Sequence, residues 1–364
     1  MLRENNVPPE NIELSEVYAD EKGIGYAVES LQPLFVADEL LATEYAQKHF
    51  GIESPFKYKI RRLTMFNERW YVTMDDALNE MRFLMSVTTF CAKSMGGISP
   101  YLLNYLMEMG KEAADLHKKW AAEYGTFFHI EVARLFKLGY YDFGADGFLA
   151  KERLLEYMNS HIGTSDTKKL IAFWTKKFFK DMAAMLKFCK DRNVRPIGVE
   201  FPILSYKWDL ASVIDLICEM DFDGKRIHAI VDFKTSTDFH EEHQLQLNCY
   251  KELWNEHFGE ILPIEHIFNW KPNDFHVNSP SQKQTKPSYT LTNQTNNDFD
   301  IEGRLMIGVN EGWFLRTPTP HYYFDGIVRL GEDVSEKAII LDFSEKFKKE
   351  VEADNPIMNN KKPE

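Results

Sequence analysis

Cysteine is scarce in this sequence, and none of the cysteines has a close neighbour of its own kind. The 364 residues contain Cys91, Cys189, Cys218 and Cys249, with no Cys-x-x-Cys spacing. This pattern excludes a disulfide-rich secreted scaffold and gives no basis for a zinc knuckle or an iron–sulfur cluster with clustered ligands. We therefore expect reduced thiols and no iron–sulfur cluster.

Long apolar segments and nucleotide-binding loops are also lacking. No apolar run approaches the roughly 20 residues that cross a bilayer, and the first 16 residues, MLRENNVPPENIELSE, contain no apolar leader. The phosphate-binding pattern Gly-x-x-x-x-Gly-Lys-Ser/Thr does not occur. We expect a chain that does not enter a membrane and carries no helicase of its own.

An overall excess of positive charge is missing as well. The formal net charge is −13, which argues against a protein that coats nucleic acid with its whole surface. Residues 165–195 are the exception, because they hold nine Lys or Arg and three Asp, a local charge of +6. Residues 166–192 have the spacing of an amphipathic helix. Its lysines form either an ordinary solvated face or a surface that follows DNA phosphates, to which we assign Lys176, Lys177 and Lys180.

Apolar residues are plentiful. Hydrophobic residues make up 44% of the chain and aromatic residues 14%, enough to fill a sizeable core. Residues 56–73 alternate as a strand does, whereas residues 74–85 have helical spacing. Helical patterns follow at 101–138, with a break near Gly125, and at 150–161. Polar residues dominate 271–304, which we expect to form a loop or flexible insertion.

The middle of the chain predicts a group of apolar strands. Residues 196–203, 210–217 and 226–234 each have a strand pattern, and Asp223-Gly224 is a hairpin turn signal between the last two. A helix is expected at 239–257 and a further strand at 264–270. The residues that carry chemistry lie within this block.

The predicted hairpin brings charged residues together at one end. Residues i and i+2 of a strand point to the same face, so Asp232 and Lys234 share a face while Phe233 points to the other. With the turn at 223–224, Asp215 lies across from Asp232 to within about one residue. Unpaired charges are costly in strands with such apolar flanks. A divalent cation, Mg²⁺ or Mn²⁺, is the natural partner for two carboxylates there.

An Asp-x-Lys triplet alone is weak support, since the sequence contains it at three other places. Only Asp232 ends an apolar strand with a second isolated aspartate, Asp215, across a hairpin. The alternative is a buried ion pair with a purely structural purpose. In a catalytic site, the two aspartates would hold the metal. Lys234 would orient or deprotonate the attacking water, or stabilise the transition state of phosphodiester hydrolysis.

Motifs around this hairpin complete a pattern that resembles the PD-(D/E)XK nuclease superfamily, in particular the RecB-type nuclease domain and stand-alone phage exonucleases. Ser212 stands where that family usually has Gly. The resemblance covers about residues 83–270. The matching segments, in chain order, are SVTT at 86–89, GTFFH at 125–129 for Gly-Thr-x-x-His, VIDLI at 213–217 for Gly-x-x-Asp-hydrophobic, DFKT at 232–235 for Asp-x-Lys-Thr, and QLNCY at 246–250 for Gln-x-x-x-Tyr.

The resemblance implies roles for single residues. His129 is expected to ligate or support the metal from a helix, and Glu200 to lie near the metal; a core histidine and an ordinary strand charge are the alternatives. Gln246 and Tyr250 share a helix face and are expected to line the site. We include Phe233 among the metal-binding residues. Relatives that hold an iron–sulfur cluster carry four cysteines in a pattern that this sequence does not have.

The resemblance also implies the fold and the function. We expect an α/β restriction-endonuclease-like core, a mixed central β-sheet flanked by helices, at residues 81–270. Residues 1–80 would form an N-terminal extension with helical additions, and residues 271–364 a loop-rich C-terminal extension that completes the core. The implied function is Mg²⁺-dependent cleavage of DNA by an exonuclease in recombination, repair or phage genome processing. It would act in the cytoplasm, that of the host for a phage protein, as a homo-oligomer or with a recombination partner.

Three alternatives stay open. The same fold supports a structure-selective or sequence-specific endonuclease, because nothing in the sequence distinguishes cleavage at DNA ends from internal cleavage. A catalytically silent DNA-binding scaffold is the second, although intact Asp215, Asp232 and Lys234 argue against it. A hydrolase of small phosphate esters is the third, and it would not need the basic helix at 166–192.

Overall fold

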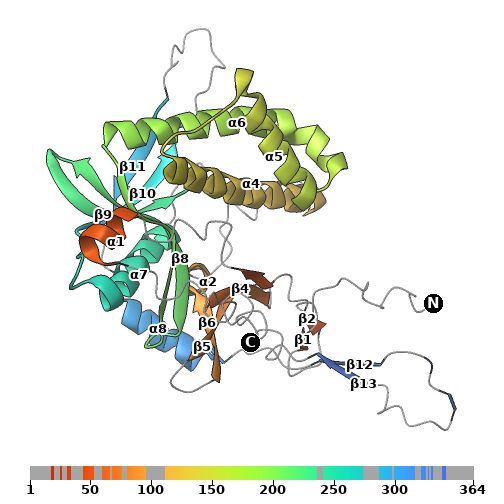
Figure 1. Ribbon diagram of the computed structural model, residues 1–364. Helices are drawn as coiled ribbons and strands as arrows, with labels where there is room; N and C mark the ends of the chain where they lie inside the picture. Colours follow the sequence, from red (N-terminus) through yellow and green to blue (C-terminus); the bar gives the residue numbers. More distant parts are fainter. Residues whose placement is uncertain are drawn as a thin grey trace, which may run out of the picture.

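Three long strands form the centre of the computed structural model: β7 (Arg195–Ser205), β8 (Leu210–Phe222) and β9 (Lys225–Phe233) (Figure 1). They are antiparallel, and β8 lies between the other two. Most of their residues are buried, which accounts for strands that are apolar on both faces. The predicted hairpin turn is confirmed, because Asp223 and Gly224 both have positive φ, 47° and 75°.

The structure describes residues 18–19, 25–26, 31–33, 44–52, 60–65, 68–75, 80–95, 111–235, 241–273, 287–296, 299–315, 321–324, 327, 329–330 and 338–341. Two small antiparallel ladders stand apart from the main sheet. One joins β1 (Tyr18–Ala19) to β2 (Gly25–Tyr26), and the other joins β12 (His321–Phe324) to β13 (Ala338–Leu341).

The main sheet has nine strands in the order β11-β10-β9-β8-β6-β5-β4-β3, with β7 paired to β8 outside this path. β10 (His266–Pro272) runs parallel to β9, and β11 (Tyr289–Asn293) is antiparallel to β10. The other half holds β3 (Leu31–Pro33), β4 (Ile60–Met65), β5 (Glu68–Asp75) and β6 (Glu80–Ser86). Parallel and antiparallel pairs therefore occur in one sheet, as expected for the predicted fold class.

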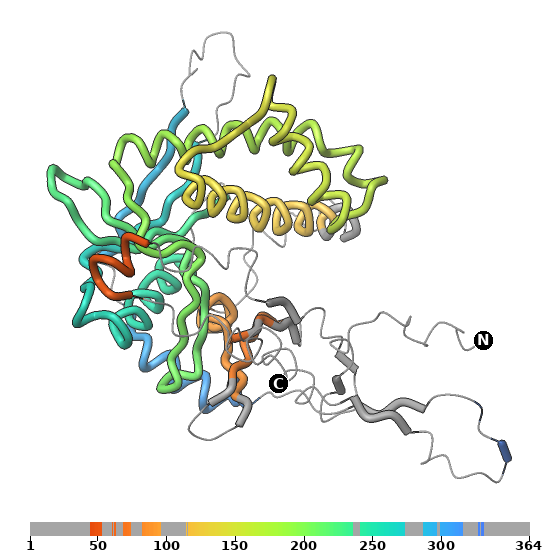
Figure 2. Tube along the Cα trace, in the orientation of Figure 1, coloured from red at the N-terminus to blue at the C-terminus, as the bar shows by residue number. Residues whose placement is uncertain are grey.

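Helices cover both faces of this sheet (Figure 1). One face carries α4 (Lys111–Leu138), a short 3-10 turn (Ala145–Gly147), α5 (Phe148–His161) and α6 (Thr164–Asp191). The other carries α1 (Glu44–Phe50), α2 (Val87–Met95), α7 (Glu241–Phe258) and α8 (Ile301–Asn310). Figure 2 shows how α2, α7 and α8, far apart in sequence, gather on one side. Each layer buries its own apolar core against the sheet.

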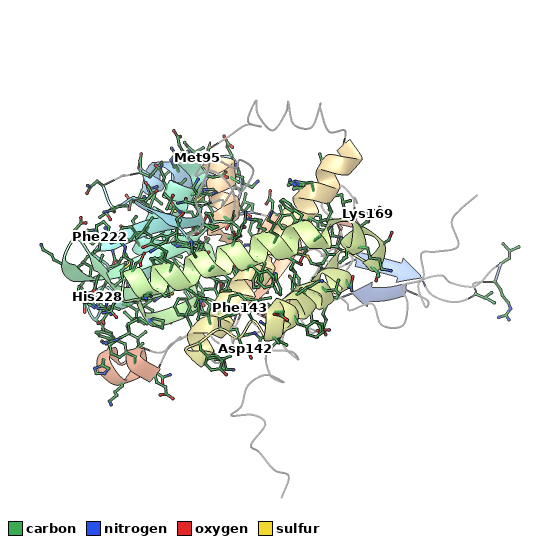
Figure 3. The ribbon with its side chains drawn as sticks, turned by 90° about the horizontal axis from the view of Figure 1, so that it is seen from above. Met95, Asp142, Phe143, Lys169, Phe222 and His228 are labelled. Carbon is green, nitrogen blue, oxygen red and sulfur yellow. The ribbon has the colours of Figure 1, made fainter. Side chains whose placement is uncertain are left out.

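The long helix α6 forms the outer edge of the α4–α6 layer and confirms the helix predicted at 166–192. Its apolar side, including Trp174, Phe178 and Phe188, is buried in the core on that face of the sheet. Seen from above, α6 crosses the molecule between its Lys169 end and Phe222 of β8 (Figure 3). Among the helices that the structure describes, none is long and apolar enough to span a membrane.

Three predictions of local structure are wrong. The helix predicted at 74–85 is wrong for its described residues, because 74–75 end β5 and 80–85 belong to β6, which pairs with β5 and places Met85 opposite Trp70. The α4 helix passes through Gly125 without a break, since burial of Phe127 and Phe128 on its core side outweighs the roughly 1 kcal/mol helix penalty of one glycine. The described part of residues 271–304 contains the end of β10, β11 and the start of α8, so the loop prediction is wrong there; residues 274–286 and 297–298 lie outside the described residues. The helical pattern predicted at 101–110 lies outside the described residues.

The described part of the N-terminal extension contains strands as well as a helix. Strands β3, β4 and β5 extend the main sheet, and α1 is the helix that the structure describes before residue 81. The predicted strand at 56–73 corresponds to β4 and β5. In α1, the Tyr45 hydroxyl donates to Glu219 of β8 (2.9 Å), which ties this addition to the central strands.

Substitutions in α6 test how this helix packs. We expect Phe178→Ala to lower the free energy of unfolding by about 3–5 kcal/mol, because the ring is fully buried. Phe173→Ala in the same helix should change it by about 0.5 kcal/mol or less, since that ring is 60% exposed. Urea unfolding followed by circular dichroism measures both. Equal destabilisation by the two substitutions would contradict this packing of α6.

Candidate active site

The candidate site lies where β9 separates from β8. The last paired residues of the two strands are Leu216 and Val231. One step further along the same register, Asp215 is opposite Asp232, as the hairpin pattern predicts. The backbone N–H of Phe233 donates to Asp215 Oδ2 (2.7 Å), so the carboxylate occupies a position that a ladder carbonyl would otherwise take. The end of the ladder therefore leaves space for two acidic side chains.

A local irregularity in β7 and β8 accompanies this opening. In a regular strand, residues two apart share a face, but Ile214 packs in the core beside α7 and Leu216 in the core beside α6. Across the ladder, Val199 and Phe201 are divided between the two cores in the same way. In each strand the side chains change from one core to the other on either side of a single residue. That residue is Glu200 in β7 and Asp215 in β8, and the register places the two opposite each other.

Glu200 has an unusual backbone conformation at this position. Its φ is +49°, in the left-handed region that non-glycine residues seldom adopt, in the middle of an otherwise extended strand. Such a conformation costs of order 1–3 kcal/mol and is typical of functional sites. The consequence here is that a second carboxylate is placed beside Asp215.

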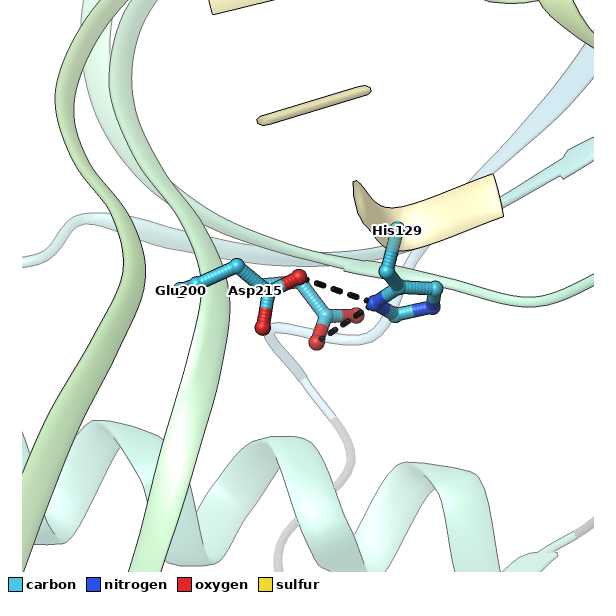
Figure 4. Close-up of side chains that lie close together, drawn as sticks. All are labelled: His129, Glu200 and Asp215. Atoms are coloured by element: carbon cyan, nitrogen blue, oxygen red, sulfur yellow. Dashed lines mark hydrogen bonds and ion pairs between the residues drawn. The ribbon is translucent and has the colours of Figure 1, made fainter. Parts of the chain in front are cut away.

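His129 of α4 completes a group of three donor side chains (Figure 4). Its Nδ1 lies 3.0 Å from Glu200 Oε1 and 3.5 Å from Asp215 Oδ1. One donor atom of each of the three residues lies within 4.8 Å of the other two. Both carboxylates are buried, and the His129 side chain is one-quarter exposed. The group is therefore sheltered but open to solvent on the histidine side.

The position of His129 follows from the packing of α4. The ring of the preceding residue, Phe128, stacks on Trp270 of β10, with centroids 5.9 Å apart and planes inclined by 7°. The His129 ring packs against the ring of Phe233, with centroids 5.9 Å apart. One turn earlier, a Cβ added at Gly125 would lie 3.6 Å from Thr235 Oγ1, so α4 passes close to the end of β9.

A second group lies on the α7 side and contains Lys234. Its Nζ donates to Asp232 Oδ1 (3.0 Å) and to Gln246 Oε1 (3.1 Å), and lies 2.9 Å from Asp232 Oδ2. Gln246 Nε2 donates to the Tyr250 hydroxyl one turn along α7. The structure thus brings together Asp232, Lys234, Gln246 and Tyr250, which the sequence had assigned to one site. Asp232 is outside the three-residue donor group of His129.

Electrostatics connect the two groups. Burial raises the pKa of Asp215, against the opposing effects of His129 and Lys234. Burial likewise raises the pKa of Asp232 to about 6, although Lys234 lowers it and Asp215 raises it further. Burial alone would lower the pKa of His129, but Asp215 and the hydrogen bond to Glu200 raise it to about 9. The acids and the histidine therefore interact as one site.

The donor set fits a divalent cation. Glu200, Asp215 and Asp232 supply hard carboxylate oxygens, the ligands that Mg²⁺ or Mn²⁺ prefer, and His129 supplies one imidazole nitrogen, a softer ligand typical of transition metals. The three buried carboxylates outnumber the two cationic groups that contact them, Lys234 and the protonated His129, and a bound cation would neutralise the remaining negative charge. In the sequence, Phe233 was assigned to metal binding. Its side chain is buried in the apolar core, so only its backbone could serve.

Three polar residues at the site were given no role there by the sequence analysis. Ser212 Oγ, at the position where Gly is usual, donates to the Tyr250 hydroxyl oxygen (3.3 Å). Asn269 Nδ2 donates to Asp232 Oδ2 (3.0 Å), and Gln294 Nε2 donates to Asn269 Oδ1 (3.2 Å). The sequence did contain one sign of this role, because Asn269 is a polar residue within the apolar run Ile267–Trp270.

The lysines assigned to DNA lie away from this cluster, on α6. Lys176 is exposed, whereas Lys180 is half-buried. Lys177 is half-buried too; its Nζ donates to the buried Asp181 (2.7 Å) and lies 5.2 Å from the centre of the Tyr124 ring. Lys177 therefore anchors α6 to α4, and its role in DNA binding remains a prediction together with those of Lys176 and Lys180.

Comparison with known proteins gives one positive result. The family model described as the PD-(D/E)XK nuclease superfamily matches residues 100–309, more than half of the chain. The matched part contains both groups of site residues and extends past residue 270 through β11 into α8. No curated protein matches the chain. With this match, and with the carboxylates and lysine of the motif gathered where β9 leaves β8, the chain belongs to the PD-(D/E)XK nuclease superfamily.

Proposed function

We propose that this protein is a deoxyribonuclease that hydrolyses phosphodiester bonds with Mg²⁺, for which Mn²⁺ can substitute. The observation that carries the proposal is the proximity of two groups: the donor atoms of His129, Glu200 and Asp215, and the Lys234 ammonium on Asp232. A structural ion pair would need only Asp232 and Lys234. Glu200 and Asp215 are further buried carboxylates, and because replacing buried ionised groups with apolar residues is often neutral or stabilising, stability alone is a poor explanation for them.

The residues have separate tasks in this proposal. Glu200, Asp215, Asp232 and His129 would hold the cation, which supplies Lewis-acid polarisation of the phosphate and lowers the pKa of the attacking water. The Lys234 ammonium orients that water or stabilises negative charge in the transition state.

Gln246 and Tyr250 keep the Lys234 ammonium in place. Lys234 is held by Gln246, and Gln246 is held by Tyr250. Tyr250 in turn accepts a hydrogen bond from Ser212 of β8, which fixes helix α7 to the sheet. The ammonium is therefore held beside the Asp232 carboxylate, as preorganised catalysis requires.

We further propose that the enzyme acts from DNA ends, in recombination, repair or phage genome processing, as a homo-oligomer or with a recombination partner. The support is the similarity of its motif order, including the segment at 86–89, to stand-alone phage exonucleases. Internal cleavage by the same fold is the competing activity. The predicted boundaries at residues 80 and 270 stay predictions, and the main sheet takes strands from beyond both.

Digestion of matched linear and covalently closed DNA tests the function directly. With Mg²⁺ or Mn²⁺ we expect loss of the end-labelled linear DNA, no cleavage of the closed circle, and no activity in EDTA, because the carboxylates need a cation to act on phosphate. Gel electrophoresis measures both substrates. Cleavage of the circle would establish an endonuclease, and no cleavage with either metal would contradict the proposed enzyme.

Lys234→Met tests the catalytic lysine. We expect kcat to fall by about 10²–10³-fold, the usual effect of removing one transition-state donor. Lys225→Met is the matched control, since Lys225 is an exposed lysine at the other end of β9. It should retain the wild-type rate. Equal rates for Lys234→Met and the wild type would assign Lys234 to a structural ion pair.

Charge reversal on α6 tests the predicted DNA surface. We expect Lys176→Glu combined with Lys180→Glu to weaken DNA binding and to reduce the slope of log affinity against log salt by about 0.9 for each phosphate that is no longer neutralised. Lys177 is left intact because its reversal would leave Asp181 without its cation. Fluorescence anisotropy in EDTA measures binding without cleavage, with Lys151→Glu on α5 as the control. Unchanged slopes would identify this surface as an ordinary solvated face.

A further inference from the structure

Asn269 is an amide at a position where its neighbours are apolar. It is fully buried in β10, between Phe268 and Trp270, which belong to the aromatic core beside α4 and α6. The parallel register of β10 and β9 sets Asn269 directly beside Asp232. Its Nδ2 donates to Asp232 Oδ2 at 3.0 Å. A buried amide is costly unless it is hydrogen-bonded, and this one is bonded to a carboxylate of the proposed catalytic site.

Gln294 determines which way the Asn269 amide faces. Gln294 follows β11 and is 2% exposed, and its Nε2 donates to Asn269 Oδ1 at 3.2 Å. Its own backbone N–H donates to the carbonyl of Ile267 (2.9 Å), which fixes it against β10. Because the Asn269 oxygen accepts from Gln294, the nitrogen is left to face Asp232. The hydrogen bonds therefore run in one direction, from Gln294 through Asn269 to the carboxylate.

The hydrogen bond from Asn269 distinguishes the two oxygens of the Asp232 carboxylate, which Lys234 does not. The ammonium lies at 3.0 Å from Oδ1 and 2.9 Å from Oδ2, so it does not distinguish between the two oxygens. Asn269 contacts Oδ2 alone and thereby gives the two oxygens different surroundings: Oδ2 accepts from the amide beside the ammonium, whereas Oδ1 accepts from the ammonium. Partners of this kind around a metal ligand typically change metal affinity or activity by about 10–100-fold.

We propose that Asn269 and Gln294 are positioning residues, which orient the Asp232 carboxylate for metal binding and for contact with Lys234. The role rests on the proposed function of Asp232. It also gives a task to a residue beyond position 270, since Gln294 would be part of the active site and not of a covering loop. A purely structural purpose is a poor explanation for two buried amides, because apolar side chains would fill the same space without the cost of desolvation.

The test is Mn²⁺ binding to the full-length protein without DNA, measured by titration calorimetry. We expect Asn269→Leu to raise the Kd for Mn²⁺ by about tenfold or more, and Gln294→Met to raise it in the same direction by less. Asn273→Leu is the matched control, because Asn273 bonds to Ser288 and Thr290 in the same strand pair but away from the site. Its Kd should equal that of the wild type. In cleavage assays the Mn²⁺ concentration for half-maximal rate should shift in parallel.

Two further measurements distinguish loss of folding, failure of the positioning role and failure of the proposed function. Thermal unfolding shows which variants fold, and Gln294→Met decides the question alone if Asn269→Leu does not fold. Folded variants with the wild-type Kd for Mn²⁺ and the wild-type metal dependence of the rate would overturn the positioning role. Asp232→Asn tests the function beneath it. If Asp232→Asn abolishes cleavage while the amide variants are normal, only the positioning role fails; if it cleaves and binds Mn²⁺ normally, the proposed function fails.

Discussion

Burial of three carboxylates at one place in an apolar sheet is the constraint on which the site depends. Glu200, Asp215 and Asp232 would be expensive there without partners, because ionised groups lose their hydration on burial. The protein offsets this with Lys234, with His129 and with hydrogen bonds from backbone and side-chain amides. The remaining excess of negative charge favours a cation. The proposed metal binding and the cost of burying the carboxylates therefore follow from the same arrangement.

The irregular ladder between β7 and β8 explains how partners reach these carboxylates from both sides of the sheet. A regular strand would send Asp215 and its neighbours two residues away to one face only. The left-handed Glu200 and the change of face between Ile214 and Leu216 instead open the sheet to both helical layers. The α4 layer supplies His129, and the α7 layer supplies the support for Lys234. The unusual backbone at Glu200 thus allows residues from both helical layers to reach one site.

The parts outside the predicted core belong to the same sheet. Strands β3, β4 and β5 continue it on one side, and β10 with β11 close it on the other. Gln294 comes directly after β11, in a region whose polar composition is typical of a loop. Pairing of β11 with β10 supplies the backbone hydrogen bonds that such a sequence lacks by itself. The main sheet therefore extends beyond the segment that contains the motifs.

Periodicity and turn chemistry act over a few residues, so the sequence alone was enough to predict the three central strands, the hairpin turn, helices α5 and α6, and the proximity of Asp232 and Lys234. It could not determine that residues 80–86 are a strand, since pairing with β5 overrides their helical spacing. Nor could it show that Glu200 adopts a left-handed conformation or that Asn269 meets Asp232. Those features depend on register between strands that are distant in the chain, and only the tertiary structure sets that register.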